Sequence, residues 1–237
     1  MRTLVLLVSL CLVACGSVLT TWVPATPQAV TLILTPALRP LTSTLYACAA
    51  SRPGISLYLE ERSVSGLKSG GEEIYVRLGY LPEAGYSVQL GWEQLTVIVN
   101  AANPISSLST DELHGLFWGQ FRQWEALGGD GGDVQVWVYS AGEDIRQAFD
   151  PVVLGNNPVT TYAMIAPDPQ AMLEAISDNP SAIGYLPESW LADNSLSTLV
   201  EVVQLEPAIE RSLRQPVLAL ASTQPSQSVR SLLSCLH

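Results

Sequence analysis

Residues 95–149 read LTVIVNAANPISSLSTDELHGLFWGQFRQWEALGGDGGDVQVWVYSAGEDIRQAF, and this stretch decides the fold class. It opens on an apolar run typical of a buried strand, and an Asn-Pro turn follows. Ser109 and Glu112 have the spacing of a helix capping box, so we expect a helix from Thr110 to about Leu116. Val134 to Tyr139 predicts a second strand, and Gly142 to Phe149 predicts a second helix. This order of elements indicates an α/β protein.

The remainder of the chain continues the alternation of strands and helices. Short apolar runs predict strands at 30–34, 55–59, 74–78, 181–185 and 216–220, with a connecting segment at 199–205. Helices are expected at 36–50, 168–178 and 226–236, and a turn or short helix at 63–67. The pattern predicts an α/β fold with mainly parallel sheets.

The opening stretch resembles the second lobe of the phosphate-binding receptors of bacterial ABC transporters. The residues that carry the resemblance are Asn103-Pro104, Leu108-Ser109, Glu112-Leu113, Leu116-Phe117, Gly119, Trp124 and Gly128-Gly129. The segment from Ser181 to Tyr185 also resembles a strand of that family. The resemblance implies a two-lobed type II periplasmic-binding-protein fold, with mixed, mainly parallel sheets and helices on both faces. It places lobe 1 at 29–98 and 200–237, lobe 2 at 99–199, and hinge crossings near 98–101 and 186–200.

The N-terminus has the features of a targeting segment. Arg2 is followed by an apolar run from Leu4 to Val13, which is too short to span a membrane. The run ends in Leu12-Val13-Ala14-Cys15, which resembles a bacterial lipoprotein cleavage box. We therefore expect a signal peptide at 1–14, lipidation of Cys15 and a tether at 15–28, which implies a protein anchored outside the cytoplasm, at the cell surface or in the periplasm. The alternative is an ordinary secretory signal in which the cysteine is a coincidence.

The charge balance is acidic, with 22 Asp and Glu against 11 Lys and Arg, for a net charge of −11. Loss of Arg2 with the signal peptide makes the mature chain more negative. This balance excludes a nucleic-acid partner, which would require a basic surface, and it is an unfavourable background for capture of an anion. We expect a monomer with no cofactor.

Two cysteines remain once the signal peptide and the lipidation site are set aside. Cys48 and Cys235 lie on expected helices near opposite ends of the chain. Disulfides persist outside the cytoplasm. The pair therefore forms either a disulfide that closes a very long loop or two buried thiols, which behave as small apolar side chains.

In the family that the chain resembles, a ligand binds between the lobes and is held by backbone N–H groups and hydroxyls at turns that precede helices. Thr35 and Ala37 occupy the first such turn, although Thr35 is equally well explained as a helix cap. Ser63 occupies the second, where Val64 replaces a family glycine and an ordinary loop is the alternative.

The third turn departs most from the family pattern. Where the family carries a Gly-Ser-Gly-Thr cradle, this chain has Gly142, Glu143, Asp144 and Ile145. Tyr139 stands where the family often has an arginine that pairs with the anion, and Ser140 beside it is a further candidate. Two carboxylates thus replace a serine and a glycine, so the site favours a neutral or cationic ligand over phosphate. Arg146 is expected to pair with Asp150, four residues along the same helix.

Aromatic residues provide a further set of candidates. Tyr139, Tyr185, Trp118 and Trp92 are candidates for aromatic faces in the cleft. For Trp118 and Trp124, packing in the core is the better interpretation.

Enzyme and metal motifs are missing from the sequence. There is no G-x-S-x-G, no P-loop lysine and no His or Cys spacing that suits a metal, and His114 has no cysteine near it in the sequence. The Gly-rich segment 128–133 does not have calcium-loop spacing and predicts a turn. We predict a binding protein rather than an enzyme.

The sequence therefore predicts a lipid-anchored solute-binding component of an ABC importer, which closes two lobes around a small-molecule or anionic ligand and docks on permease subunits. The alternative is a lipoprotein outside transport that uses a degenerate form of the same scaffold for sensing or for binding another protein.

Overall fold

The computed structural model describes residues 26–63, 73–79, 85–192 and 194–236. The expected signal peptide, the lipidation site Cys15, most of the tether and the part of the second turn after Ser63 lie outside these residues. Within the described residues, no helix has both the length and the apolar character needed to cross a membrane.

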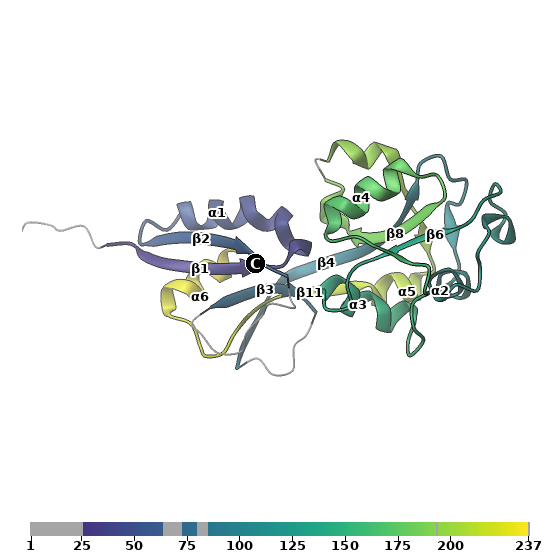
Figure 1. The fold of residues 1–237 in the computed structure, drawn as a ribbon. Coiled ribbons are helices and arrows are strands. Elements are labelled where there is room, and N and C mark those ends of the chain that lie inside the picture. The colour runs from purple at the N-terminus through teal and green to yellow at the C-terminus, as the bar shows by residue number, and fades with distance from the viewer. Residues whose placement is uncertain (1–25, 64–72, 80–84, 193, 237) are drawn as a thin grey trace, which may run out of the picture.

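Lobe 1 is built on a sheet with three parallel strands at one side (Figure 1). β1 (Gln28–Leu34) lies between β2 (Ile55–Glu61) and β3 (Ile74–Leu78), and it runs parallel to both. β11 (Arg214–Ala221) lies on the other side of β3 and runs antiparallel to it. The last three residues of β1 are all buried, as expected for a strand that is covered on both faces.

The longest strand, β4 (Tyr86–Asn100), connects the two lobes. Its residues 86–94 pair with β11 in lobe 1, whereas residues 95–99 pair with β8 (Ala182–Pro187) in lobe 2. A single strand therefore runs through both lobes and changes its partner between Gln94 and Leu95. The exact boundaries expected at 98/99 and 199/200 remain a proposal.

Lobe 2 continues the sheet beyond β8 with parallel strands. β6 (Gln135–Val138) pairs with β8 and with β7 (Met164–Ile165), while β9 (Val200–Val202) pairs antiparallel with the end of β4. The larger helices of this lobe are α2 (Thr110–Trp118), α3 (Asp144–Val153) and α4 (Pro169–Asp178). The mixed α/β architecture with two lobes confirms the predicted fold class.

Local sequence signals account for the helix boundaries. The capping box is present, because the Ser109 Oγ accepts from the Glu112 N–H and the Glu112 carboxylate accepts from the Ser109 N–H at 2.8 Å. Gly119 ends α2 in the left-handed region at φ 87°, which a glycine adopts at little cost. Asp168 caps α4 by accepting from the Ala171 N–H at 2.9 Å.

Shorter elements complete the fold. They are β5 (Ser107–Leu108), which pairs with β10 (Gln204–Leu205), the helix α5 (Pro207–Ser212), and the 3-10 helices η1 (Pro36–Leu41), η3 (Trp124–Leu127), η4 (Glu188–Trp190), η5 (Ser195–Leu199) and η6 (Ser234–Leu236). The single helix expected at 36–50 is in fact two helices, η1 followed by α1 (Thr42–Ala50). Pro40 explains the break, because its ring removes a backbone donor and disfavours an α-helical turn before it.

A cluster of aromatic rings forms the centre of lobe 2. The rings of Phe149 and Tyr185 stack with centroids 3.6 Å apart, and Phe117 and Tyr139 meet Tyr185 edge-on. The Tyr139 hydroxyl donates to the Tyr185 carbonyl at 2.9 Å. Both tyrosines are completely buried in this core, so the expectation that their rings face the cleft is wrong. The Tyr139 hydroxyl is thus satisfied in the core, whereas the buried Tyr185 hydroxyl has no hydrogen-bond partner among the described residues.

The two tryptophans assigned to the core behave differently. Trp124 is buried and donates to the Ser181 carbonyl at 3.0 Å. Trp118 is 46% exposed and lies beside the ring of His114, so its assignment to the core is wrong. Trp118 is the last residue of α2 and directly precedes Gly119, at which the helix ends.

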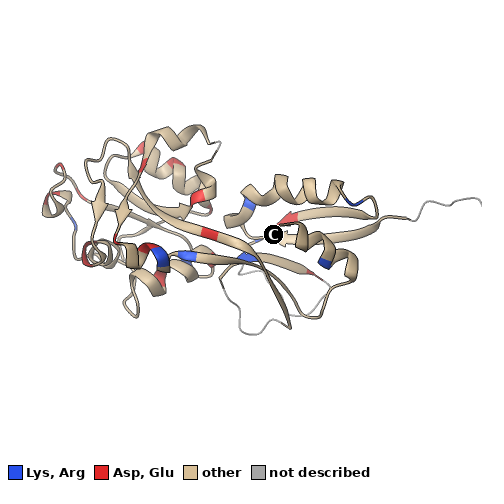
Figure 2. Ribbon diagram, turned by 180° about the vertical axis from the view of Figure 1, so that it is seen from behind, with Lys and Arg blue, Asp and Glu red and all other residues tan. Residues whose placement is uncertain are grey.

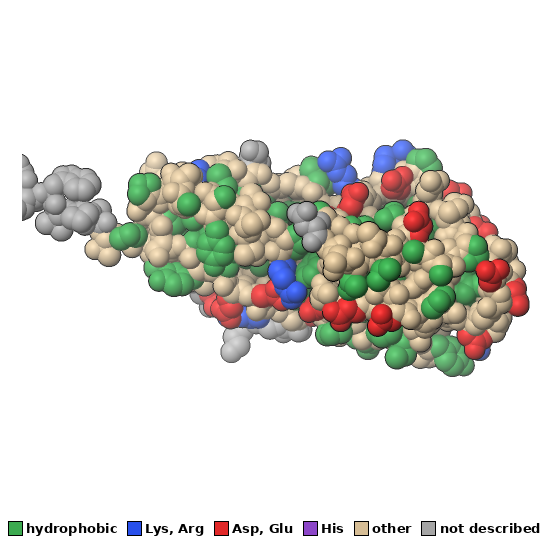
Figure 3. Space-filling view, turned by 90° about the horizontal axis from the view of Figure 1, so that it is seen from above, with side chains coloured by type: hydrophobic (Ala, Val, Ile, Leu, Met, Phe, Trp, Pro, Cys, Tyr) green, Lys and Arg blue, Asp and Glu red, His purple; other side chains and the backbone are tan. Residues whose placement is uncertain are grey.

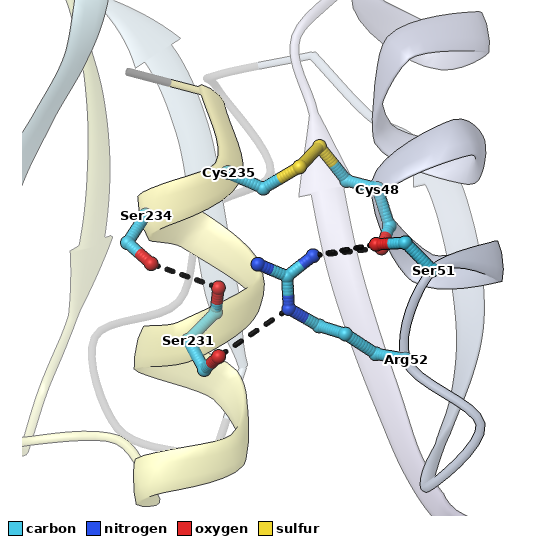
Figure 4. The surroundings of a disulfide bond; sticks show 6 residues. All are labelled: Cys48, Ser51, Arg52, Ser231, Ser234 and Cys235. Carbon is cyan, nitrogen blue, oxygen red and sulfur yellow. Dashed lines mark hydrogen bonds between the residues drawn. A yellow bond between two sulfur atoms is a disulfide. The ribbon is translucent and has the colours of Figure 1, made fainter.

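A disulfide joins the two ends of the described chain (Figure 4). Cys48 of α1 and Cys235 of η6 are bonded, with their Cα atoms 5.9 Å apart and their positions in the sequence separated by 187. The bridge ties α1 to the C-terminal segment that begins with α6 (Gln227–Leu233). Arg52 reinforces the same junction by donating to the Cys48 carbonyl at 2.9 Å and to the Ser231 hydroxyl at 3.3 Å.

Candidate functional site

The candidate site lies where lobe 1 meets the start of α3 in lobe 2. β1 and β3 are parallel, so their carboxyl ends reach the same edge of the sheet, where Thr35 and Leu78 lie. The N-terminus of α3 faces this edge from the other lobe, with Glu143 as its cap residue and Asp144 as its first residue. The first and third predicted turns are thereby brought together, and Ser63 of the second turn also reaches the start of α3.

The Asp144 carboxylate bridges the two lobes. Its Oδ2 accepts from the Thr35 hydroxyl at 2.7 Å and from the Leu78 N–H at 2.8 Å, and both donors belong to lobe 1. Its Oδ1 accepts from the N–H of Ile145, within its own helix, at 2.9 Å. Asp144 is 1% exposed and Thr35 is 2% exposed, so this contact is shielded from water.

Burial raises the pKa of the Asp144 carboxyl above its ordinary value. The hydrogen bonds from Leu78 and Thr35 and the positive charge of Arg77 act in the opposite direction and partly offset that cost. Burial therefore disfavours the charged carboxylate, and the donors that surround it stabilise that form.

Arg77 lies beside this carboxylate, and sequence reasoning did not identify it. It is 2% exposed, and burial lowers the pKa of its guanidinium. The Nε donates to the Leu78 carbonyl at 3.0 Å, and Nη2 donates across the lobes to Gln147 Oε1 at 2.8 Å. An arginine within the apolar strand Ile74–Leu78 was the available signal, because a buried charge requires a partner.

Glu143 makes a second contact between the lobes. The Ser63 hydroxyl, two residues after the end of β2, donates to Glu143 Oε1. Glu143 is buried, and its N–H donates to the carbonyl of the exposed Ser140 at 3.0 Å. The Gly142 carbonyl accepts from the side chain of Gln147 at 3.2 Å. Both carboxylates that replace the family cradle therefore bind hydroxyls of lobe 1.

The remaining candidates of the first and third turns are already in contact with other parts of the protein. Among the described residues, the Thr35 side chain does not cap η1, so its hydroxyl is committed to Asp144. Ala37 is buried, and its carbonyl accepts from Trp190 Nε1 at 2.8 Å. Ile145 is buried in lobe 2.

Arg146 and Trp92 each have a side-chain partner nearby. Arg146 pairs with Asp150 at 2.9 Å, which confirms the expected ion pair, and it also donates to the Tyr139 carbonyl at 2.7 Å. Trp92 is exposed on the lobe 1 part of β4, where the Arg214 guanidinium lies 5.1 Å from its ring centroid. Trp92 thus faces solvent, whereas the Asp144 contact is buried.

A groove of about 660 Å³ lies beside the junction of the lobes, lined by Arg39, Pro40, Leu41, Ser189, Trp190, Ala192, Asn194 and Ser195. Arg39 forms a bidentate pair with Glu61 at 2.6 and 2.7 Å, and it reaches Asp168 of lobe 2 at 3.4 Å. The hydrogen bond to Glu61 raises the pKa of Arg39. Because these groups are about 40% exposed, the pairs add little to stability.

Negative charge is concentrated in residues 99–199, which form most of lobe 2. Residues 99–199 contain 13 Asp and Glu and two Arg, and no Lys. Figure 2 shows most of the red segments in this lobe, and in Figure 3 acidic side chains gather over the same half of the molecule. An anion that approaches lobe 2 is therefore repelled at long range. Among the described residues there is no group of three or more His, Cys, Asp or Glu that suits a metal ion.

Comparison with known proteins gives one match to a family and many similar folds. A family model for the PBP superfamily domain matches residues 86–230. A protein from Clostridium perfringens, described as a phosphate ABC transporter substrate-binding protein with bound phosphate, is 17% identical with a TM-score of 0.73, over 88% of this chain and 93% of that chain. An ABC-type phosphate transport receptor from Vibrio cholerae is 20% identical with a TM-score of 0.66, over 87% and 93%. The regulatory domain of CcmR from Synechocystis, in complex with 2-PG, is 14% identical with a TM-score of 0.64, over 88% and 95%.

Proposed function

Because the chain belongs to the PBP superfamily, we propose that it is an extracytoplasmic solute-binding protein of an ABC importer, held at a bacterial membrane by a lipid on Cys15. The family is one of binding proteins, and two similar folds are named for phosphate transport, which supports a role in uptake. The apolar run that ends in Ala14-Cys15 supports the anchor. In this role the protein delivers its solute to permease subunits.

The solute proposed here is neutral or cationic and is not inorganic phosphate. The observation that carries this proposal is the Asp144 carboxylate, which already accepts from Thr35 and Leu78. Glu143 likewise occupies the hydroxyl of Ser63. When the lobes part, the start of α3 presents two carboxylates, and these attract a positively charged group and repel an anion.

Calorimetry of phosphate binding tests this proposal. The mature protein is expected to give no binding signal with phosphate at concentrations up to about 1 mM. The triple variant Glu143→Ser, Asp144→Gly, Ile145→Thr restores the hydroxyl-and-glycine cradle of the resembling receptors, and it is expected to bind phosphate at least about a hundredfold more tightly. Native mass spectrometry of freshly purified protein then identifies the natural solute as a co-purified mass.

A matched control separates the cradle from the overall charge. Glu174→Gln with Asp178→Asn also removes two negative charges, but from exposed positions on α4. This double variant is expected to remain silent toward phosphate. Micromolar phosphate binding by the unaltered protein would contradict the proposal.

A second function is favoured by one specific observation. The lobes are already joined by side-chain hydrogen bonds, and the similar CcmR fold is named as a regulatory domain. A lipoprotein outside transport, which uses the scaffold for sensing or for binding a protein, fits both facts. It is distinguished by the absence of a co-purified solute and by the lack of a thermal shift with any member of a panel of amines, sugars and amino acids.

A further inference from the structure

We infer that Asp144 is a built-in ligand: a carboxylate of lobe 2 fills the donor set of lobe 1 and keeps the two lobes closed when no solute is bound. The inference concerns the unliganded protein, and it holds whether or not the protein carries the solute proposed above.

The geometry of the carboxylate distinguishes this role from an ordinary first-turn acid. An acid at a helix start usually faces the N–H groups of its own helix or the solvent. In Asp144 only Oδ1 does so, through the Ile145 N–H. Oδ2 is directed across the interface, where it accepts from the Thr35 hydroxyl and the Leu78 N–H at 2.7 and 2.8 Å. One oxygen therefore serves two donors of the opposite lobe.

Because the Asp144 carboxylate, the Thr35 hydroxyl and the Leu78 N–H are buried, the hydrogen bonds between them favour closure of the lobes. A buried N–H or O–H without an acceptor is strongly unfavourable. In a receptor whose cleft donors wait for a solute, closure leaves such donors unpaired until the solute arrives. Here a side chain supplies the acceptor, so the lobes close with Thr35 and Leu78 satisfied.

Further contacts between the same two lobes flank Asp144. Ser63 donates to Glu143, the residue before it, and Arg77 donates to Gln147, one turn along α3. Each of these pairs joins a residue of lobe 1 to the first turns of α3. The closed arrangement is thus held over the whole start of the helix, with the Asp144 carboxylate at its buried centre.

The rival interpretation is that Asp144 is simply a structural carboxylate, whose loss weakens the fold without opening the cleft. The two interpretations differ in how the protein responds to small anions. If Asp144 is an internal ligand, a free carboxylate such as formate takes its place in a variant that lacks the side chain. A general loss of packing is not repaired by formate.

The decisive variant is Asp144→Ala, studied in the mature chain with its disulfide intact. Hydrogen exchange of the Leu78 amide, measured by NMR, reports the contact directly, and small-angle X-ray scattering reports the separation of the lobes. Loss of two charge-assisted hydrogen bonds is expected to shift the balance between closed and open forms by roughly a hundredfold or more. The Leu78 amide then exchanges correspondingly faster, the radius of gyration increases, and formate reverses both changes.

Asp150→Ala is the matched control, because it removes a carboxylate of the same helix that pairs with Arg146 inside lobe 2. It is expected to leave Leu78 exchange and the radius of gyration unchanged. An Asp144→Ala protein that stays closed, or that opens without any response to formate, overturns the inference. If the variant does not fold, the unaltered protein decides: after unfolding and refolding to remove any solute, it must scatter as the closed form, and an open form overturns the inference.

Discussion

Removal of the disulfide between Cys48 and Cys235 is expected to lower the free energy of unfolding by about 3–5 kcal/mol. The two residues are 187 positions apart, and cross-linking a loop of that length removes about 5 kcal/mol of chain entropy from the unfolded state. Arg52 lessens the loss, because its guanidinium still connects α1 to Ser231 of α6 when the bridge is absent.

Urea unfolding of the oxidised and reduced forms of the unaltered protein measures this difference. With a denaturant dependence of about 2–3 kcal/mol per molar urea, the midpoint is expected to fall by about 1–2 M on reduction. The double variant Cys48→Ala, Cys235→Ala is expected to show a similar fall. Its small excess over the reduced protein gives the packing contribution of the two sulfurs.

The reasoning would be refuted by a midpoint that moves by less than about 0.3 M on reduction. In that case either the segments around Cys48 and Cys235 would stay close together in the reduced, unfolded chain, or the disulfide would not be present in the folded protein. A midpoint that falls only in the double variant, and not on reduction, would assign the effect to packing.

Three further changes have defined outcomes. Burial raises the pKa of Glu93 above 4.5, so its contribution to stability is largest below the unfolded pKa and is lost as the pH rises through the folded value. As the pH rises from about 4 to about 8, the stability of the Glu93→Gln variant should therefore fall less than that of the unaltered protein, as measured by thermal unfolding. Gly184→Ala should cost about 1–3 kcal/mol, because the added Cβ would collide with the Met172 sulfur, and urea unfolding measures this. Ser109→Ala should cost about 1 kcal/mol in the same assay, through loss of the capping box.

The elements that the sequence predicted well are those whose causes are local. The capping box of Ser109 and Glu112, the cap at Asp168 and the apolar run of β1 each depend on residues within a few positions of one another. The Arg146 pair with Asp150 is local in the same sense. Such features can be predicted because the backbone geometry of a helix or strand already brings these residues together.

The errors arise where the outcome depends on distant contacts. Trp118 and Trp124 are six residues apart, yet Trp124 is buried with its indole N–H on the Ser181 carbonyl, whereas Trp118 is exposed. Tyr139 follows a strand, as a cleft residue would, but its hydroxyl is satisfied by Tyr185 inside the core. The partner in each case is more than forty residues away, so the local pattern contains no information about it.

The same limit explains why the candidate site was predicted only in part. The sequence identified Thr35, Ser63, Glu143 and Asp144 as candidates, through the turns that they occupy. It did not predict that these residues would bind one another, because that depends on the relative placement of the lobes. The Leu78 N–H, a donor that no side chain reveals, was therefore missed.

A side chain that serves as a ligand also determines which solutes are rejected. A phosphate bound at the same donors would place its charge within about 4 Å of the Asp144 carboxylate, and at an effective dielectric constant of 20 this repulsion is about 4 kcal/mol for each unit of charge. Such a penalty weakens binding by about a thousandfold. A solute with a positively charged group gains from the same field, and it need not compete for the Thr35 and Leu78 donors. Asp144, which stands where the resembling receptors have a glycine, thus both closes the lobes in the absence of phosphate and excludes phosphate from the site.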